Sequence, residues 1–450
     1  MCQRHAMTSR VSPAGTGRGR LTLLPGLSRL WRDETAVQLG TDPSRAIVIE
    51  LPDAGAARVL DLLDGSRTER AVLRDAVALG VPRHVTSAMI SALRTANVLI
   101  GTESLVPSSM PETVRRRLLT EAAAIAMAMR AEEIPGIEEY GDDPTPSTDR
   151  TRTPTPADST TDRTRTSTRT GLAPDQTTPA ERSIPERPIP ERSISERSVP
   201  ARPVASGRPV RRVPPAEAIR RRAAASVQVT GASRLVVPIA STLARAGVGH
   251  VDPAVSGRVG IHDDAIGGLT PADTDRPRGT AASEAVLRAA PFTDTRALRV
   301  GGASFVVQVG QGVPAELAAF AYARKSLAHL LIEERDDIVL IGPLVPPSGS
   351  PCLRCLDLHR RDRDPAWPTL VAQLATSIDS APTISTATTL IAVGVAVAQV
   401  LAYLDGDDAP TIGASIEVGS PSTLRRRSWG PHPRCDCAYR SRQRRRARAG

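Results

Sequence analysis

The sequence predicts an α/β domain over residues 219–440, in which a mostly parallel sheet is covered by helices on both faces. Two observations lead to this fold class. Apolar segments of strand length alternate with longer segments of helical period throughout the region, and such alternation is typical of βαβ units. Four cysteines occur late in the same region in two close pairs, Cys352 with Cys355 and Cys435 with Cys437. Their number matches the tetrahedral coordination of a structural zinc ion.

The region opens with the strand–turn–helix unit of a Rossmann-like fold. Residues 225–230 form an apolar strand segment, Gly231-Ala232-Ser233 supplies a turn, and residues 235–246 have the apolar repeat of a helix. In such a unit the helix N-terminus faces the end of the strand, where nucleotide phosphates bind. Further strands are expected over residues 250–255, 304–309 and 338–341, and further helices over residues 284–289, 316–321, 367–374 and 385–404.

An apolar run over residues 387–404 approaches the length of a membrane span. It consists mainly of small apolar residues, contains Gln399 and lies between polar segments of the domain. We therefore expect a buried helix and no membrane-spanning segment. Residues 1–20 lack the apolar core and cleavage site of a secretion signal. Together with the clustered cysteines, this favours a cytoplasmic protein.

A smaller α+β module is expected over residues 21–135. Residues 30–40 and 46–51 alternate apolar and polar side chains around the turn at residues 41–44, which predicts a hairpin. Three helices follow over residues 54–63, 69–79 and 83–96, with Thr68 as the N-cap of the second. A short strand at residues 98–100 and a helix over residues 112–133 complete the module. This order resembles a winged-helix module.

A segment of different composition separates the two regions, over residues 136–218. Between residues 142 and 214 there is no Phe, Trp, Tyr or Met, and Leu172 is the only leucine. So little apolar surface cannot offset the entropy of ordering, and we expect a disordered linker. Residues 1–20 are expected to be a disordered start, and residues 441–450 a basic tail.

The formal net charge of +10 raises nucleic acid as a partner. The excess arginines gather in short runs such as residues 220–222, 425–427 and 440–448. Aromatic residues make up only 2% of the chain, so these runs lack the stacking platforms of single-strand binders. Solvated surface is the favoured interpretation, and a zinc-containing nucleic-acid binder that uses the basic tail is the weakest of three hypotheses.

The two cysteine pairs differ in spacing, because two residues separate Cys352 from Cys355 and one residue separates Cys435 from Cys437. The tighter second pair leaves open that His432 or His359 replaces one sulfur ligand. Disulfides are not expected in a cytoplasmic chain, and the first pair lacks the strand-to-helix setting of a redox pair. A four-cysteine structural zinc site is the favoured interpretation. It would leave no thiol for a covalent thioester step except Cys2.

A sequence block that runs from Pro351-Cys352-Leu353-Arg354-Cys355-Leu356-Asp357-Leu358-His359 to Asp364-Pro365-Ala366-Trp367-Pro368, together with Ala246-Gly247-Val248-Gly249, is distinctive. These residues resemble the ThiF/MoeB/HesA adenylyltransferase family. More narrowly, they resemble the actinobacterial bacteriocin-biosynthesis cyclodehydratase subgroup, whose N-terminal module binds a leader peptide. The resemblance covers roughly residues 21–100 and 223–438.

The chain departs from this family where ATP would bind. The glycine-rich turn of active members is replaced by Gly231-Ala232-Ser233-Arg234-Leu235-Val236, with one glycine left. The acidic positions after the second strand fall at Val255, Ser256 and Gly257, and the triphosphate-gripping element is replaced by residues 265–269. Gly231, Ser233 and Val255 therefore mark a degenerate nucleotide site. ATP is not an expected cofactor, and no catalytic residue is assigned.

The resemblance implies a scaffold in ribosomal peptide biosynthesis of the bacteriocin or azole class. The small module would capture a precursor leader peptide as an added strand, and the α/β domain would dock a YcaO-type cyclodehydratase. Related folds are commonly dimeric, so a homodimer is a further expectation. The alternative function is an active adenylyltransferase that activates a carboxyl terminus with ATP. The candidate peptide-binding edge comprises Ala46, Ile47, Val48, Ile49, Glu50 and Leu51.

Overall fold

The computed structural model describes residues 19–42, 45–107, 109–132, 213–299, 301–310, 315–347, 351–374, 383–419 and 423–437. They belong to one compact unit formed by residues 1–142 and 212–450. The expected start, most of the expected linker and the basic tail lie outside the described residues. The described residues form a small N-terminal module and the α/β domain.

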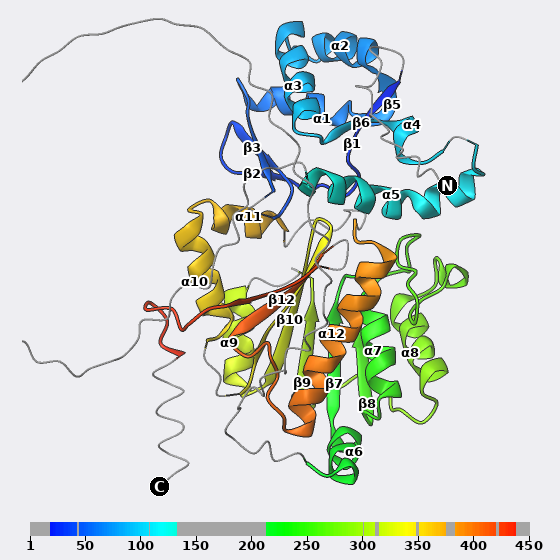
Figure 1. The fold of residues 1–450 in the computed structure, drawn as a ribbon, viewed down its shortest axis with the longest axis vertical. Helices are drawn as coiled ribbons and strands as arrows, with labels where there is room; N and C mark the ends of the chain where they lie inside the picture. Colours follow the sequence, from blue (N-terminus) through cyan, green and yellow to red (C-terminus); the bar gives the residue numbers. More distant parts are fainter. Residues whose placement is uncertain are drawn as a thin grey trace, which may run out of the picture. The chain divides into compact units, whose positions relative to one another are not determined.

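A seven-stranded sheet in the order β13-β12-β11-β10-β9-β7-β8 forms the centre of the α/β domain (Figure 1). The four strands from β8 to β10 are parallel, whereas β10 to β13 pair antiparallel. The parallel strands are β7 (Ser226–Gly231), β8 (His250–Ala254), β9 (Phe305–Val309) and β10 (Ala328–Arg335). The others are β11 (Ile338–Val345), β12 (Ala414–Gly419) and β13 (Thr423–Ser428).

The sheet is thus mixed, although the sequence favoured a mostly parallel one. The difference arises at the tight turn between β10 and β11, where Asp336 adopts a positive φ of 50° and reverses the chain. A two-residue connection can join only antiparallel neighbours, because a parallel connection needs a long crossover. Strands β10, β12 and β13 were not predicted. The α/β class itself is confirmed.

Helices cover both faces of this sheet. On one face lie α7 (Val236–Arg245), α8 (Arg278–Ala289) and α12 (Thr386–Asp405), and α6 (Pro215–Ala224) packs beside α12. The other face carries α9 (Ala315–Arg324) and α10 (Leu353–Arg363). Strand β10 illustrates why the sheet needs helices on both faces. Leu330 and Ile332 belong to the core under α12, whereas Leu331 packs with α9. Alternate side chains of a strand point to opposite faces, so an apolar strand needs cover on both.

Helix α12 is the apolar run that the sequence placed inside the domain. It is long and apolar enough to cross a membrane by length and composition, with a mean hydropathy of 2.0. Here it packs along the sheet, and Ala396, Val397 and Val400 are buried in the main core. Gln399 accepts hydrogen bonds from the amide and hydroxyl of Thr411 at 3.1 and 3.0 Å. The helix therefore has the packing of a core element.

The N-terminal module contains two three-stranded sheets with the orders β5-β1-β6 and β2-β3-β4. The strands are β1 (Arg20–Leu23), β2 (Arg29–Trp31), β3 (Ala36–Leu39), β4 (Ile47–Glu50), β5 (Asp64–Thr68) and β6 (Leu99–Gly101). The helices are η1 (Ala54–Ala57), α1 (Arg58–Asp61), α2 (Glu69–Ala78), α3 (Arg83–Thr95), α4 (Thr102–Leu105) and α5 (Glu112–Glu132).

These bounds agree closely with the helices expected from the sequence. The hydroxyl of Thr68 accepts a hydrogen bond from the Ala71 amide at 3.4 Å, as its predicted N-cap role requires. The expected strand over residues 30–40 is divided into β2 and β3 by bends over residues 32–35. Strands β1 and β5 were not predicted, and β5 contains Asp64, Gly65 and Ser66, which are poor strand formers. The winged-helix type of this module remains a prediction.

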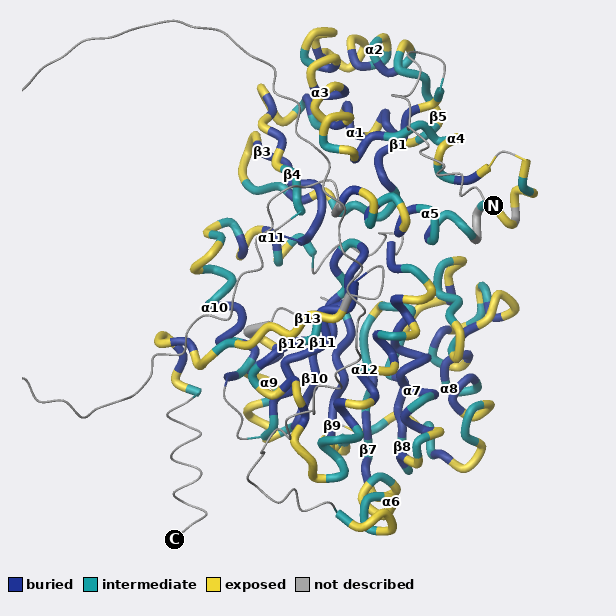
Figure 2. Tube along the Cα trace, in the orientation of Figure 1, coloured by how far each residue is buried: buried dark blue, intermediate teal, exposed yellow. Residues whose placement is uncertain are grey.

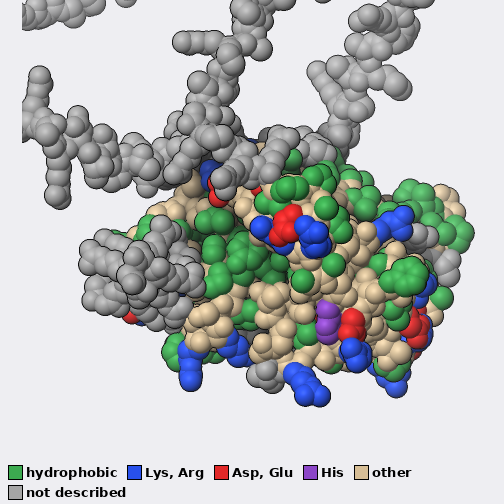
Figure 3. Space-filling view, turned by 90° about the horizontal axis from the view of Figure 1, so that it is seen from below, with side chains coloured by type: hydrophobic (Ala, Val, Ile, Leu, Met, Phe, Trp, Pro, Cys, Tyr) green, Lys and Arg blue, Asp and Glu red, His purple; other side chains and the backbone are tan. Residues whose placement is uncertain are grey.

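Buried and exposed segments alternate along both regions in the way that two-sided packing demands (Figure 2). On the face seen from below, acidic and basic side chains lie next to each other (Figure 3). Helix α6 illustrates this balance, because Glu217 pairs with Arg220 at 3.0 Å and with Arg221 at 3.1 Å. Such exposed pairs contribute little to stability and are typical of solvated surface.

Candidate functional site

The C-terminal ends of the parallel strands form the place where a nucleotide site would lie. The strand order reverses between β7 and β9, since the chain first moves outward to β8 and then returns to β9. Ligands of open α/β sheets bind at such a switch point. The predicted residue Gly231 ends β7 at this edge, Ser233 lies two residues after it, and Val255 follows β8. The structure therefore brings the three positions to the same edge of the sheet.

Gly231 is required by the sheet. Its φ is +138°, and a Cβ atom there would lie 1.8 Å from the carbonyl oxygen of Val309 on β9. No side chain fits between the two strands at that distance. The one glycine left in the turn is thus explained by the close approach of β7 to β9.

Ser233 faces an acidic side chain. Its hydroxyl donates a hydrogen bond to the carboxylate of Glu334 on β10 and accepts one from the amide of Leu235 at 2.9 Å. Burial raises the pKa of Glu334, although Ser233 and Arg234 oppose that effect. A carboxylate therefore lies against the turn where a phosphate-binding protein would present free amides.

Arg278, the first residue of α8, closes the turn from the other side. Its guanidinium donates to the carbonyl oxygens of Ala232 and Ser233 at 3.2 and 3.3 Å, and to Asp263 at 2.9 Å. The side chain is 10% exposed. Asp263 also accepts from the Gly260 amide at 2.8 Å, so this carboxylate is committed to its own loop. The turn presents carbonyl oxygens to an arginine, which is the reverse of an anion site.

Arg234 connects the turn to the segment at the start of α12. It donates to the carbonyl oxygen of Ile384 and to the hydroxyl of Thr389 at 3.1 Å, which ties the turn to the start of α12. Burial lowers the pKa of Arg234, although the carboxylates of Glu334, Glu121 and Asp264 oppose that effect. Like Arg278, it interacts with groups of its own chain.

Val255 and the loop after it are packed against the domain. Val255 contacts the main core and a second apolar cluster that includes Val237 and Leu269. In that loop, a Cβ on Gly268 would lie 2.7 Å from Pro238 of α7. Residues 265–269 therefore lie tightly on α7, and the position after β8 is occupied by the apolar side chain of Val255.

The four predicted cysteines come together in one cluster. The sulfur atoms of Cys352, Cys355, Cys435 and Cys437 all lie within 4.8 Å of one another. Sγ of Cys352 is 3.7 Å from that of Cys435, and Sγ of Cys355 is 3.3 Å from that of Cys437. A tetrahedral zinc ion with bonds of about 2.3 Å places its sulfurs about 3.8 Å apart. The cluster can therefore hold a metal ion of this kind, and these distances exceed a disulfide bond.

The local fold suits this use. Cys352 is the N-cap of α10 and Cys355 lies in the first turn of that helix, where the helix dipole favours a thiolate. Contact with Cys355 raises the pKa of Cys352, and burial raises the pKa of Cys435 to about 11. Metal binding must therefore displace protons from these thiols.

Neither histidine of the region joins the cluster. Nε2 of His432 lies 2.7 Å from the Asp362 carboxylate, and its Nδ1 accepts from the Arg434 amide at 3.1 Å. Nε2 of His359 lies 3.1 Å from the carbonyl oxygen of Gly430. Both ring nitrogens of His432 are thus occupied. The two rings meet edge to face at 4.8 Å beside the cysteines.

Strand β4 contains four of the six residues predicted to bind a peptide. It is the last strand of its sheet and pairs with β3 only, among the residues that the structure describes. The Leu51 amide donates to Thr35 at 2.9 Å. Antiparallel alternation then turns the backbone groups of Ile47 and Ile49 toward β3, and those of Val48 and Glu50 outward. Val48 is 45% exposed.

The opposite edge of the same sheet, β2, is covered by the α/β domain. In α11 (Trp367–Leu374), the Gln373 side-chain amide donates to the Trp31 carbonyl oxygen and accepts from the Trp31 amide, both at 2.7 Å. Arg32 donates two hydrogen bonds to Asp364 at 3.0 and 2.6 Å. Only the β4 edge remains open in the part of this sheet that the structure describes.

The loop that precedes β4 rests on the β10–β11 turn. Asp336 accepts hydrogen bonds from the amides of Thr41 and Asp42 at 3.0 and 3.1 Å, and Asp337 pairs with Arg45. Burial raises the pKa of both Asp336 and Asp337. These contacts set the position of the strand that follows the loop.

Sequence reasoning missed the residues that join the two regions. Trp367 of the distinctive block is 4% exposed, and its Nε1 donates to Asp357 at 2.8 Å. Arg360 lies 5.0 Å from its ring, and the Arg360 guanidinium pairs with buried Glu333 at 2.5 Å. Asp364 is the C-cap of α10, just before α11, and accepts hydrogen bonds from Arg32. An unusual motif was visible in the sequence, but its partners on β10 and β2 were not.

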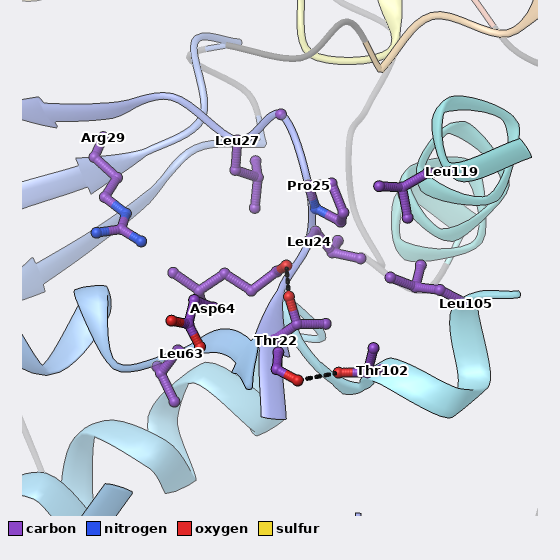
Figure 4. A pocket seen from close by; sticks show the side chains of 13 residues that line it. Thr22, Leu24, Pro25, Leu27, Arg29, Leu63, Asp64, Thr102, Leu105 and Leu119 are labelled. Atoms are coloured by element: carbon purple, nitrogen blue, oxygen red, sulfur yellow. Dashed lines mark hydrogen bonds between the residues drawn. The ribbon is translucent and has the colours of Figure 1, made fainter. Parts of the chain in front are cut away.

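The N-terminal module also contains a pocket of about 410 Å³ between the β1–β2 connection, α4 and α5 (Figure 4). Leu24, Leu27, Leu63, Leu105 and Leu119 line it. The carboxylate of Asp64 on its wall already accepts from the Ser66 amide at 2.8 Å. The pocket has a mixed lining, because Thr22, Arg29, Asp64 and Thr102 also line it.

No family model matches the sequence, and no curated protein matches it. Among solved structures, the chain is similar to E. coli MccB with ATP, at 12% identity and a TM-score of 0.40 over 93% of this chain and 99% of that chain. The microcin C7 biosynthetic enzyme MccB in complex with N-formylated MccA matches at 10% identity and a TM-score of 0.41 over the same shares. PaaA matches at 16% identity and a TM-score of 0.35, over 47% of this chain and 75% of that chain.

Proposed function

We propose that this chain is a ThiF/MoeB/HesA-like scaffold of ribosomal peptide biosynthesis that does not use ATP. It binds a precursor leader peptide at β4 and presents that peptide to a YcaO-type cyclodehydratase of bacteriocin or azole formation. Zinc, held by Cys352, Cys355, Cys435 and Cys437, has a structural role only. The observation that carries the proposal is the Glu334 carboxylate against Ser233.

The turn after β7 disfavours triphosphate in three ways. Glu334 would repel a phosphate at Ser233, Arg278 already binds the carbonyl oxygens of the turn, and Val255 supplies no acidic group for a ribose or magnesium. A charge-assisted contact contributes about 1.5–3 kcal/mol. The loss of three such contacts, roughly 4.5–9 kcal/mol, moves a micromolar nucleotide site beyond about 1 mM.

The β4 edge supports the peptide half of the proposal. Within the described residues, the outward amides and carbonyl groups of Val48 and Glu50 have no partner, while Gln373 occupies the corresponding groups of Trp31 at the other edge. An extended peptide can therefore add at one edge of this sheet. The contacts of Asp336 and Asp337 with residues 41–45 hold that edge in a set place relative to the α/β domain.

Peptides encoded by short reading frames beside the gene provide the probes. Labelled peptides are titrated with the chain and with Val48→Pro, whose ring removes an outward amide but no ladder bond to β3. Val48→Ala is the matched control, because it shortens the side chain and keeps the amide. We expect Val48→Pro to weaken binding at least about tenfold and Val48→Ala to weaken it much less. Equal binding by both variants would refute addition at β4.

The YcaO-type partner is tested in two ways. A gene for such an enzyme should lie next to the gene for this chain, and the two proteins should co-purify. Conversion of the peptide by that enzyme should accelerate when the chain is added, and Val48→Pro should abolish the acceleration. Acceleration that requires ATP binding by this chain would favour the adenylyltransferase alternative.

A further inference from the structure

Strand β13 ends the seven-stranded sheet, and no described part of the chain covers either of its faces. It pairs with β12 alone among the described residues. Every residue from Leu424 to Ser428 is exposed (Figure 2), and Leu424 is 57% exposed. Native proteins usually shorten, bend or cover such an edge, because its free amides and carbonyl groups pair with other chains. A six-residue open edge therefore calls for an explanation.

The register shows which backbone groups are free. The Trp429 amide donates to the Gly413 carbonyl oxygen at 3.1 Å, which makes these two residues a hydrogen-bonded pair. Alternation along the ladder turns the backbone groups of Arg425 and Arg427 toward β12. The amides and carbonyl groups of Leu424, Arg426 and Ser428 point outward.

This edge is strongly basic. Arg425, Arg426 and Arg427 are consecutive, so they project on both faces of the sheet. Arg427 pairs with Glu417 of β12 at 3.0 Å, and Arg426 donates to the Pro410 carbonyl oxygen at 3.2 Å. Glu417 is the one acidic residue of β12 and β13, and the register places it on the face of Arg425 and Arg427, so Arg426 on the opposite face has no carboxylate from these two strands beside it. A second copy of β13 would place arginine against arginine, which disfavours pairing between copies.

The cysteine cluster holds the end of this strand. Cys435 and Cys437 follow β13 and meet Cys352 and Cys355 at the start of α10. Trp429, directly after the strand, packs in the apolar cluster under α9 and α10. A strand without covered faces gains little stability from burial. Metal binding by the four cysteines would stabilise the position of β13 in place of a hydrophobic core. The edge is held in place before any partner arrives.

We propose that β13 is a docking edge for an acidic, extended segment of a partner protein. The segment adds as a strand against Leu424, Arg426 and Ser428, and its carboxylates pair with the arginines on the two faces. This site is separate from the β4 edge and does not depend on the function proposed above.

The test uses the full zinc-loaded chain and a labelled ten-residue peptide of alternating Glu and Val. Binding is followed by fluorescence anisotropy at about 150 mM salt, where long-range attraction is screened. Arg426→Pro removes an outward amide without breaking a bond to β12, and Arg426→Ala is its matched control. Zinc content and melting temperature confirm that both variants fold.

We expect the acidic peptide to bind, a peptide of alternating Gln and Val to bind at least about tenfold more weakly, and Val48→Pro to leave binding unchanged. Arg426→Pro should weaken binding at least about fivefold more than Arg426→Ala. Equal affinities of these two variants would show attraction by charge without strand addition and would overturn the proposal. Absence of binding, or tighter binding of single-stranded DNA than of the peptide, would also overturn it.

Discussion

His329 provides a sharp test of how the sheet is packed. It lies on β10, is 4% exposed, and its ring stacks 4.5 Å from that of Tyr322. Nδ1 lies 3.0 Å from the Leu327 carbonyl oxygen, whereas Nε2 is buried without a partner in the described residues. Burial lowers the pKa of His329 from 6.5 to about 4. The folded protein therefore holds this imidazole neutral.

The sign of the effect follows from proton linkage. The unfolded chain binds the proton at pH values where the folded chain does not, so stability is complete above pH 6.5 and is lost as the pH falls toward 4. The difference between 6.5 and about 4 corresponds to about 3 kcal/mol in total. Of this, about 2 kcal/mol is lost at pH 5.

Urea unfolding at pH 8 and pH 5, followed through the fluorescence of buried Trp367, measures this loss. The variant His329→Gln is expected to be less stable at pH 8 by about 1–2 kcal/mol, because a hydrogen bond and ring packing are removed. Its further loss between pH 8 and pH 5 should be about 2 kcal/mol smaller than that of the parent. Equal losses in parent and variant would refute the buried, neutral state of His329.

Three further predictions concern the cysteine cluster and two ion pairs. Metal analysis should return about one zinc per chain. The variant Cys352→Ser should lose the metal and lower the melting temperature on the order of 10 °C. The control variant Cys2→Ser should change neither the zinc content nor the melting temperature. A double-mutant cycle of Arg32→Ala and Asp364→Asn should give a coupling energy of about 1–2 kcal/mol in unfolding experiments. The pair is bidentate, and the side chains of Arg32 and Asp364 are only 24% and 23% exposed. Additive effects of the two substitutions would show that the pair does not join the regions. Burial raises the pKa of Glu333, but Arg360 and Arg335 outweigh it and hold that pKa at about 2, so Arg360→Gln should lower stability at pH 7 by about 2–3 kcal/mol. That deficit should shrink as the pH falls from 4.5 to 2, because both proteins then carry a protonated Glu333; a constant deficit would contradict the ion pair.

The sequence predicted those parts of the fold that local patterns determine. The apolar periods of its strands and helix predict the first βαβ unit around Gly231. The number and spacing of the four cysteines predict that they form one cluster. Strands β12 and β13 were missed because β13 is an arginine-rich, exposed strand with no apolar alternation to detect. It exists because β12 and the cysteine cluster hold it, and both are tertiary features.

The same division holds for the candidate nucleotide site. The loss of glycines around Ser233 was visible in the sequence. What fills the space was not, because Glu334 and Arg278 reach the turn from β10 and α8, which lie 101 and 45 residues away in the chain. Likewise, Gln373 closes the β2 edge over a separation of 342 residues. Side chains that meet through the topology leave no short-range signal.

The central claim is that this chain has exchanged its nucleotide pocket for an internal network of Ser233, Glu334 and Arg278. Isothermal titration of the zinc-loaded protein with ATP and magnesium tests it most directly. We predict no saturable binding up to about 1 mM nucleotide. A dissociation constant in the micromolar range would contradict the claim and restore the chain to the ATP-using adenylyltransferases.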